Sequence, residues 1–264
     1  MPLTVSQPQL CYALSGPSDA PPLVFINGLG GVQAAFQLQV RAFRESRRVL
    51  VYDHRGAGGS QTVDTPVTMA NYAADLVRLL DELALDCCDV VGLSFGGRVA
   101  QELALGWPER VRRLVLSGTS AGGRLHAPGD AHAHELLRAV ATADADEWAQ
   151  TVAPVLFGRS YRERHPERIA ALARWRARHR PDPVGIARQW GAWDGFDLAD
   201  EIAEIAQPTL IIHGTEDGLS PVVNAEQLAA YIPDARLELL DGVGHSPNVE
   251  APQAFNQLIE DFVS

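Results

Sequence analysis

The stretch Gly92-Leu93-Ser94-Phe95-Gly96 decides the fold of this chain. A run typical of a buried strand, Cys88 to Gly92, leads into it, and a helical pattern from Gly97 to Leu105 follows it. Such a tight turn between a strand and a helix holds its central residue in a strained conformation and lifts that side chain clear of the sheet. The flanking glycines keep Cβ atoms away from the turn. The pattern therefore predicts that Ser94 is a nucleophile within reach of a substrate.

A second stretch fits the same pattern, Gly118-Thr119-Ser120-Ala121-Gly122, and it also follows a strand-like run, Val111 to Leu116. The residues after it, Gly123 to Gly129, have no apolar period and cannot open a helix. Ser120 is therefore predicted to lie in a loop, and Ser94 to be the nucleophile.

Apolar runs alternate with helical patterns on both sides of the turn at Ser94. Further strands are predicted near Thr4-Val5 and at Gln9–Leu14, Leu23–Ile26, Arg48–Asp53, Val111–Leu116, Thr209–Ile212 and Arg236–Leu240. Helices are predicted at about 32–43, 69–85, 221–231 and 251–262. This alternation predicts an α/β fold, with a mostly parallel sheet of eight strands covered by helices on both faces.

Residues 122 to about 200 interrupt the alternation. They contain no convincing strand but several helical stretches, and four of the five tryptophans fall among them. We therefore expect a core domain made of residues 1–121 and 201–264, with residues 122–200 inserted as a helical cap (lid). Such a cap lies over the carboxyl ends of the strands, where ligands bind in open α/β folds.

The composition is ordinary for one globular domain, with 264 residues of which 46% are hydrophobic and 21% charged. The net charge of -11 argues against binding to nucleic acid. The first residues lack a basic and an apolar segment, and no run of about 18 apolar residues occurs, so we expect a soluble, cytoplasmic protein without a membrane partner. The three cysteines, Cys11, Cys87 and Cys88, are expected to be small buried residues in a reducing compartment.

A serine nucleophile needs an imidazole to take its proton, and the imidazole needs a carboxylate to hold its tautomer. His245 follows the last predicted strand, at the same edge of the sheet as Ser94. The loop after the preceding strand offers Glu216 and Asp217. Asp217 is preferred, and the chain order Ser, Asp, His is typical of this kind of nucleophile. His213 is expected to be structural.

The oxyanion formed by attack needs backbone donors, which are predicted to be the N–H groups of Phe95 and Leu29. A dinucleotide loop is the competing interpretation of the glycines around Leu29, but it requires a small residue where this chain has Gln33. The stretch His132-Ala133-His134-Glu135 lacks the spacing of a metal site. We therefore expect no cofactor and no metal.

The chain resembles the α/β-hydrolase superfamily over essentially its full length. The resemblance rests on Asn27–Gly31, Asp53–Ser60, Gly92–Gly97, Gly214–Asp217 and Gly244-His245. The nearest subgroup resembles the 3-oxoadipate enol-lactonases and small carboxylesterases, although many members have His in place of Asn27. The resemblance implies that Ser94, His245 and Asp217 hydrolyse a small carboxylic ester or lactone through an acyl-enzyme, without a cofactor. Carbon–carbon bond hydrolysis and perhydrolysis use the same triad and stay open.

The segment from Tyr161 to Arg180 carries seven arginines against two glutamates. Charged helix faces are usually solvated. The alternative is that Arg174 or Arg178, beside Trp175, faces the pocket and binds a substrate carboxylate, with Trp190 as a further contact. That would favour an anionic substrate such as 3-oxoadipate enol-lactone. A non-hydrolytic small-molecule receptor, a purely structural or interaction role and a homodimer also stay open.

Overall fold

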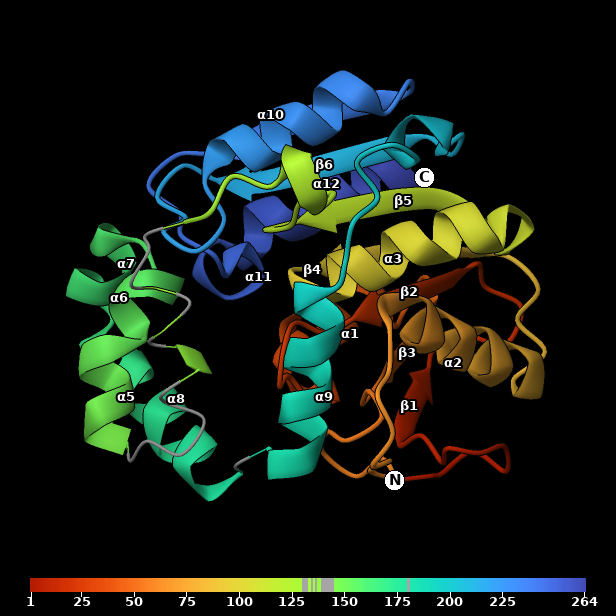
Figure 1. Ribbon diagram of the computed structural model, residues 1–264, viewed down its shortest axis with the longest axis horizontal. Helices are drawn as coiled ribbons and strands as arrows, with labels where there is room; N and C mark the ends of the chain where they lie inside the picture. Colours follow the sequence, from red (N-terminus) through yellow and green to blue (C-terminus); the bar gives the residue numbers. More distant parts are fainter. Residues whose placement is uncertain (130–132, 134, 136, 139–144, 180) are drawn as a thin grey trace.

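A computed structural model describes residues 1–129, 133, 135, 137, 138, 145–179 and 181–264. These residues form one seven-stranded sheet with helices on both faces and a further group of helices beside it (Figure 1). The strands are β1 (Tyr12–Ser15), β2 (Pro22–Ile26), β3 (Arg48–Tyr52), β4 (Cys88–Leu93), β5 (Val111–Ser117), β6 (Thr209–Gly214) and β7 (Ala235–Leu240).

The strand order is β1-β3-β2-β4-β5-β6-β7. β1 runs antiparallel to β3, and the other pairs are parallel. The predicted mostly parallel sheet is confirmed, but the predicted count of eight strands is wrong for the described residues. Near the N-terminus, Leu3 makes only an isolated bridge to Cys11. The N–H groups of Val5 and Ser6 donate to the Glu82 carboxylate at 2.8 and 2.7 Å, so they are not available to a neighbouring strand.

The helices follow the apolar periods of the sequence. The α-helices are α1 (Gln37–Phe43), α2 (Met69–Glu82), α3 (Phe95–Gly106), α5 (Ala145–Thr151), α6 (Ala153–Leu156), α7 (Arg159–Arg164), α8 (Pro166–Arg178), α9 (Pro183–Asp194), α10 (Val222–Tyr231), α11 (Pro247–Glu250) and α12 (Pro252–Val263). The 3-10 helices are η1 (Gln33–Phe36), η2 (Pro108–Arg110), η3 (Gly123–Leu125) and η4 (Ile202–Glu204). The predicted helix at 32–43 is thus divided into η1 and α1. Within the described part of the chain, no helix combines the length and the apolar content that crossing a membrane requires.

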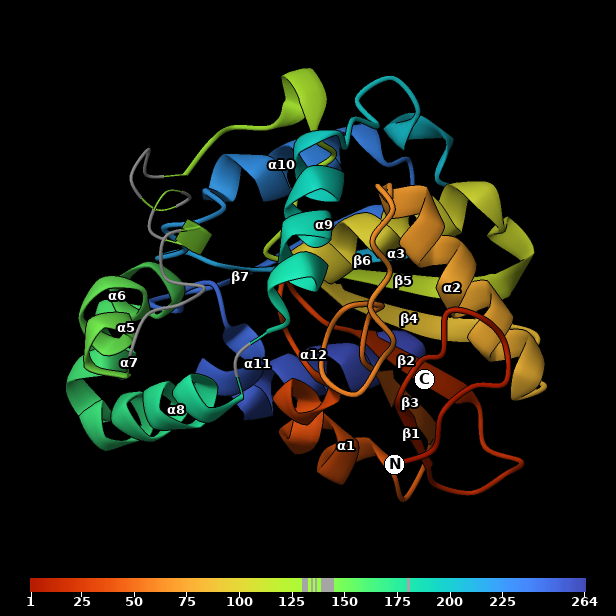
Figure 2. The same cartoon turned by 60° about the horizontal axis from the view of Figure 1, so that its bottom comes forward.

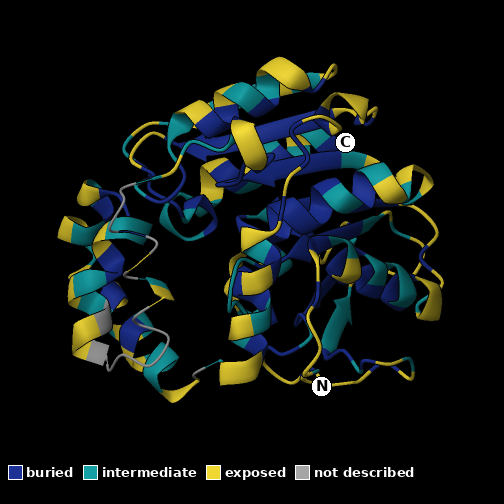
Figure 3. Cartoon of the chain, in the orientation of Figure 1, coloured by how far each residue is buried: buried dark blue, intermediate teal, exposed yellow. Residues whose placement is uncertain are grey.

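The strands contribute alternate side chains to two apolar cores. In β2, Leu23 and Phe25 pack on the face covered by α1 and α12, whereas Val24 and Ile26 pack on the face covered by α2, α3 and α10. Neighbouring residues of a strand point to opposite faces, so a run that is apolar at every position must be covered on both sides. Figure 3 shows the result, with buried strands between helices whose outer surfaces are exposed.

The helices of the expected cap lie outside the sheet (Figures 1 and 2). α5, α6, α7 and α8 share an apolar cluster of their own, whereas α9 lies close to the core. There the backbones of Gly185 and Gly56 meet, and a Cβ at Gly185 would lie only 1.9 Å from the carbonyl oxygen of Gly56. The chain enters and leaves this region through neighbouring segments, joined by an antiparallel bridge between Gly122 and Asp197.

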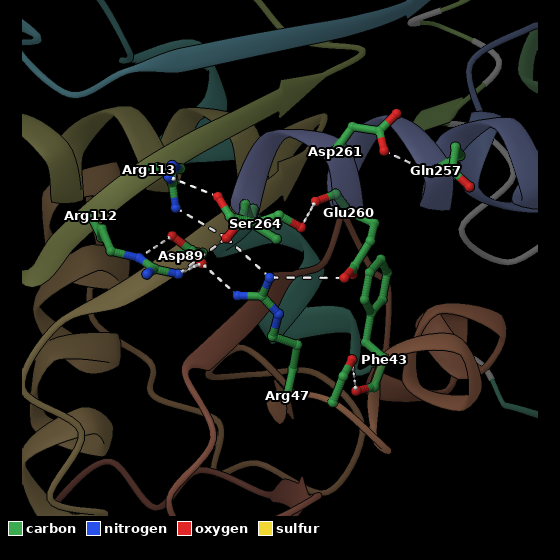
Figure 4. A network of polar contacts seen from close by, with 11 residues as sticks. Phe43, Arg47, Asp89, Arg112, Arg113, Gln257, Glu260, Asp261 and Ser264 are labelled. Carbon is green, nitrogen blue, oxygen red and sulfur yellow. Dashed lines mark hydrogen bonds and ion pairs between the residues drawn. The ribbon is translucent and has the colours of Figure 1, made fainter.

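An ion network ties the C-terminus to the end of the sheet that lies opposite the strand–helix turn (Figure 4). Asp89, at the start of β4, is fully buried and pairs with Arg47 at 3.5 Å and with Arg112. Arg47 and Arg113 each donate to the carbonyl oxygen of Val263 at 3.0 Å. The network therefore joins β4 and β5 to the end of α12.

Candidate active site

Ser94 occupies the turn between β4 and α3. Its φ of 57° and ψ of -115° are strained for a residue with a side chain. Its N–H donates to the carbonyl oxygen of Ser117 at 2.8 Å, which fixes the turn against β5. A Cβ at Gly92 would lie 2.5 Å from the carbonyl oxygen of Gly96, and a Cβ at Gly96 would lie 2.2 Å from that of Ile26. Close backbone approach therefore requires both glycines of the pattern.

The loops after β6 and β7 bring Asp217 and His245 together. His245 Nδ1 lies 2.8 Å from Asp217 Oδ2, and both side chains are buried. Because this contact assigns the proton to Nδ1, Nε2 is the ring nitrogen available to a nucleophile. Ser94 and His245 line the same pocket. Glu216, the other carboxylate considered for this role, instead accepts a hydrogen bond from the N–H of Arg159 at 2.6 Å.

The surroundings of Asp217 favour its charged form. Its Oδ1 accepts hydrogen bonds from the N–H groups of Leu219 and Ser220 at 2.9 and 2.8 Å. Burial opposes ionisation, but His245 and these donors hold the pKa of Asp217 below its ordinary value. Burial lowers the pKa of His213, whose Nε2 contacts the carbonyl oxygen of Ser220 at 2.7 Å. His213 thus contacts the loop that carries Asp217, and its Nε2 also lies 3.4 Å from Asp217 Oδ2.

Glu250, which sequence reasoning missed, organises the loop of His245. Its carboxylate accepts hydrogen bonds from the N–H groups of Gly244 at 3.0 Å, Ser246 at 3.1 Å and Gly158 at 2.8 Å. Burial raises the pKa of Glu250 against the effect of these donors. The N–H of His245 also donates to the last residue of α6 at 3.0 Å. The only sequence signal for this role is an acidic residue one turn after a serine that begins a helix.

The loop after β2 and the start of α3 carry the two backbone N–H groups predicted to bind the oxyanion. Leu29 lines the pocket. The N–H of Gly30 is occupied, because it donates to Gln189 Oε1 of α9 at 2.7 Å. Among the described residues, the N–H of Leu29 makes no hydrogen bond, as an oxyanion donor requires. Phe95 is the first residue of α3, where helix geometry provides no partner for the N–H.

Asn27 and Asp53, two motif residues without a predicted catalytic role, hold neighbouring loops in place. Asn27 Nδ2 donates to the carbonyl oxygen of Tyr52 at 2.8 Å, which ties the loop after β2 to β3. Asp53 accepts hydrogen bonds from the N–H of Gln33 at 2.7 Å and of Gly59 at 3.0 Å. Asn27, which stands where many relatives have His, therefore holds this loop and its backbone N–H groups in position through the bond to β3.

The pocket at Ser94 has a volume of about 170 Å³ and a mainly apolar lining. Besides Ser94 and His245, it is lined by Gly28, Leu29, Gly31, Ala35, Leu93, Leu137, Val152, Leu156, Arg176, Pro181, Ile186, Leu219 and Ser246. An adjoining cavity of about 330 Å³ shares several of these residues, including Leu93 and Arg176, and continues to Trp175 and His179. The cleft between core and cap is therefore longer than the pocket at the nucleophile.

The arginine that lines the pocket is Arg176, not Arg174 or Arg178, which are exposed. Residues two positions apart on a helix point about 200° apart, so alternate arginines cannot all face one pocket. The buried residues of α8 are Ile169 and Ala173, and Arg176 continues that stripe. Burial lowers the pKa of Arg176, but a guanidinium stays charged at neutral pH.

The two tryptophans predicted as substrate contacts lie in different places. Trp175 lines the adjoining cavity, with its ring stacked on His179 at 4.6 Å between centres. Trp190 is buried and lines neither of these two cavities. The guanidinium of Arg138 lies 4.2 Å from the centre of its ring.

Among the described residues, no group of three or more metal-binding side chains is present. His132 and His134 of the His132–Glu135 stretch lie outside the described residues. The arrangement at Ser94 instead offers a hydroxyl, an imidazole held by a carboxylate and two backbone donors. These are the groups that acyl transfer requires.

Comparison with known proteins agrees with this geometry. The family profile of the alpha/beta hydrolase fold matches residues 21–252. The chain belongs to the α/β hydrolase family. This α/β hydrolase is 32% identical to 3-oxoadipate enol-lactonase 2 of Acinetobacter baylyi, with 98% of this chain and 94% of the relative covered. It is 31% identical to a protein of Variovorax paradoxus named as the carbamate hydrolase RutD, with 97% and 96% covered.

The crystal structure of the enol-lactonase from Burkholderia xenovorans LB400 superposes on this α/β hydrolase with a TM-score of 0.87. The two share 29% sequence identity, and the superposition covers 99% of each chain. The predicted α/β-hydrolase fold is thereby confirmed. The relatives support hydrolase activity, and they include both a lactonase and a protein named for carbamate hydrolysis.

Proposed function

We propose that this hydrolase cleaves a carboxylic ester or lactone of a small molecule through Ser94, His245 and Asp217. The observation that carries the proposal is the 2.8 Å contact between His245 Nδ1 and Asp217 Oδ2, beside Ser94 in one pocket. A buried, ionised carboxylate holds the imidazole tautomer and stabilises the imidazolium that forms during catalysis. The 3-oxoadipate enol-lactonase at 32% identity supports this class of substrate.

In the first half of the reaction, Ser94 Oγ attacks the substrate carbonyl carbon while His245 Nε2 takes its proton. The carbonyl oxygen becomes an oxyanion facing the N–H groups of Leu29 and Phe95. When the carbonyl reforms, the bond to the leaving oxygen breaks and His245 protonates that oxygen. For an ester the alcohol departs, and for a lactone it stays attached to the acyl group.

In the second half, His245 removes a proton from water, which attacks the acyl-enzyme. The same two N–H groups face the second oxyanion, and the bond to Ser94 Oγ breaks as the serine recovers its proton from His245. The acid is released and the enzyme returns to its starting state. His245 and the two backbone donors thus serve both halves of the reaction.

The substrate that fits this pocket best carries a carboxylate. Among the described residues, Arg176 is the one arginine in a mainly apolar lining, and guanidinium binds carboxylate through two parallel hydrogen bonds. An anionic enol-lactone would place its ring at Ser94 and its carboxylate toward α8. The similarity to the enol-lactonase of Burkholderia xenovorans LB400 supports this choice over a neutral ester.

The activity is tested with a panel of p-nitrophenyl esters, neutral lactones, a carboxylated enol-lactone and a carbamate. We expect the esters and lactones to be hydrolysed and Ser94→Ala to reduce kcat/KM by at least about 10³-fold. A variant as active as the parent would exclude Ser94 as the nucleophile. Turnover of the carbamate alone would favour the activity for which the Variovorax relative is named. Acylation of Ser94 without turnover would indicate a receptor.

The substrate charge is tested with Arg176→Gln and, as a matched control on the same helix, Arg174→Gln. We expect Arg176→Gln to raise KM for the carboxylated lactone by about 10- to 100-fold, because a hydrogen bond between charged groups is lost. Neutral esters should change by less than about twofold, and Arg174→Gln should affect neither. An equal rise in KM for charged and neutral substrates would reject a carboxylate at Arg176.

A further inference from the structure

A second cavity lies at the base of the cap, and none of its described lining residues also lines the pocket at Ser94. Its volume is about 320 Å³. It is formed where the chain enters the cap, at Gly122 to Pro128, and where it leaves the cap, at Trp193 to Phe196. The bridge between Gly122 and Asp197 holds these two connections together. A ligand in this cavity would contact the core and both connections at once.

Arg98, in the first turn of α3, lines this cavity although it is only 2% exposed. Its guanidinium donates to the carbonyl oxygen of Trp193 at 3.0 Å and to Ser120 Oγ at 3.1 Å. It lies 3.6 Å from the centre of the Trp193 ring and 5.0 Å from that of Phe196. In the described part of the chain, no carboxylate forms an ion pair with Arg98, and its Nε has no hydrogen-bond partner.

A buried cation without a carboxylate is unfavourable, because neutral hydrogen bonds and ring contacts replace only part of its hydration. Burial lowers the pKa of Arg98 to about 9, so the group stays charged at neutral pH but binds its proton less tightly. In the described structure, the nearby carboxylate, Asp194, is paired with Arg138 at 2.5 Å. The described lining of the cavity therefore has two guanidinium groups and one carboxylate, in a chain whose net charge is -11.

Ser120, the serine of the second glycine–serine pattern, contacts two residues that line this cavity. Its hydroxyl contacts both Arg98 and His126 Nδ1, the latter at 2.9 Å. Ser120 is only 1% exposed and no helix begins directly after it, so it positions Arg98 and His126. His126 also lines the cavity. Cationic and hydrogen-bonding groups thus converge there from the core and from both connections of the cap.

We propose that this cavity binds a small oxyanion, a carboxylate or phosphate group, between Arg98 of the core and Arg138 of the cap. Guanidinium groups bind such oxygens through strong, charge-assisted hydrogen bonds. The bound anion brings a negative charge to Arg98, with which no described carboxylate forms an ion pair. Because it joins α3 to the segments that carry the cap, its binding stabilises the protein by linkage.

The experiment titrates acetate, succinate and inorganic phosphate into Ser94→Ala/Arg176→Gln protein, in which binding near the nucleophile is weakened. Calorimetry measures the affinity, and tryptophan fluorescence reports on Trp190 and Trp193, which lie against the two arginines. Chloride at equal ionic strength provides the baseline. We expect saturable binding of at least one of these anions, and comparing carboxylates with phosphate identifies which group the cavity prefers.

In the same background, Arg138→Gln should weaken this binding at least tenfold. Arg138 is half exposed, so its replacement is compatible with folding, which circular dichroism verifies. Arg124→Gln is the matched control, because Arg124 lies in η3 and pairs with Asp200 without lining the cavity. Arg98→Lys should also weaken binding. Equal affinity in the Arg138 and Arg124 variants, or no saturable binding of any anion, would overturn the proposal.

Discussion

Asp217 and Glu216 are adjacent carboxylates, and their contacts predict that only the substitution of Asp217 lowers the activity strongly. Asp217 contacts His245 Nδ1, whereas Glu216 accepts a hydrogen bond from the cap. In Asp217→Asn the new amide can donate to Nδ1 and so favours the wrong imidazole tautomer. We expect kcat/KM for the best ester to fall by about 10³- to 10⁴-fold. Initial-rate measurements on Glu216→Gln provide the control, and equal losses in the two variants would argue against Asp217 as the acid.

His54 is a buried histidine outside the active site, and it predicts how stability depends on pH. Burial lowers its pKa from 6.5 to about 4, against the effect of its contact with the carbonyl oxygen of Asn27. The unfolded chain therefore takes up the proton at a higher pH than the folded chain does. The contribution of neutral His54 to stability is complete above pH 6.5 and is lost as the pH falls toward 4.

We expect this residue to reduce the free energy of unfolding by about 1.4 kcal/mol per pH unit within that window. Denaturant titrations between pH 7 and pH 4 should show a smaller pH dependence for His54→Gln than for the parent. His179→Gln, which removes an exposed histidine, should leave the dependence unchanged. The same slope in all three proteins would show that His54 is not the group that titrates.

The position of α9 depends on the contact between Gly185 and Gly56. A methyl group at Gly185 would overlap the Gly56 carbonyl, so Gly185→Ala must displace α9. Because Gln189 of this helix holds the N–H of Gly30, the displacement reaches the loop that carries Leu29. We expect Gly185→Ala to lower both Tm and kcat/KM and to make the cap more sensitive to limited proteolysis.

Gly191 provides a matched control on the same helix, since a Cβ there would meet no atom within 4 Å. Gly191→Ala should keep full activity and stabilise the protein by about 0.5–1 kcal/mol through its better helix propensity. If both alanine variants behaved alike, the contact between Gly185 and Gly56 would not control the position of α9.

The two ends of β4 have separate roles in the whole molecule. Asp89 at its start is buried among arginines, whereas Ser94 follows its end. Asp89→Asn removes the charge that these arginines require, so we expect the free energy of unfolding to fall by about 3–5 kcal/mol. Under native conditions kcat/KM should change little. The control is Asp261→Asn, an exposed site at which a change below about 0.5 kcal/mol is expected.

The sheet and its helices could be predicted because their signals are local. Apolar runs without polar interruption predict strands buried on both faces, and β2 is such a strand. The prediction of an eighth strand was wrong because of a contact between distant segments. Glu82 of α2 accepts hydrogen bonds from the backbone N–H groups of Val5 and Ser6. Arg176 could have been found from the i, i+4, i+7 stripe that begins at Ile169.

Cavities, and hydrogen bonds or ion pairs between distant segments, could not be predicted in this way. Glu250 acts through backbone N–H groups of the cap and of the His245 loop, and no spacing in the sequence reports such contacts. Likewise, Arg98 lies in a helix whose pattern is ordinary. No described carboxylate forms an ion pair with Arg98, and this depends on which segments pack around α3.

The sequence by itself determined the parallel sheet, the turn at Ser94 and the choice of Asp217 and His245 as its expected partners. These follow from periodicity, glycine placement and the order of loops along the chain, which are properties of neighbouring residues. Only the tertiary structure decided which arginine faces the pocket, how Glu250 holds the His245 loop and that Arg98 lines a second cavity. Those depend on helix rotation and on contacts between segments far apart in the chain, because burial and electrostatic balance arise only when the chain is packed.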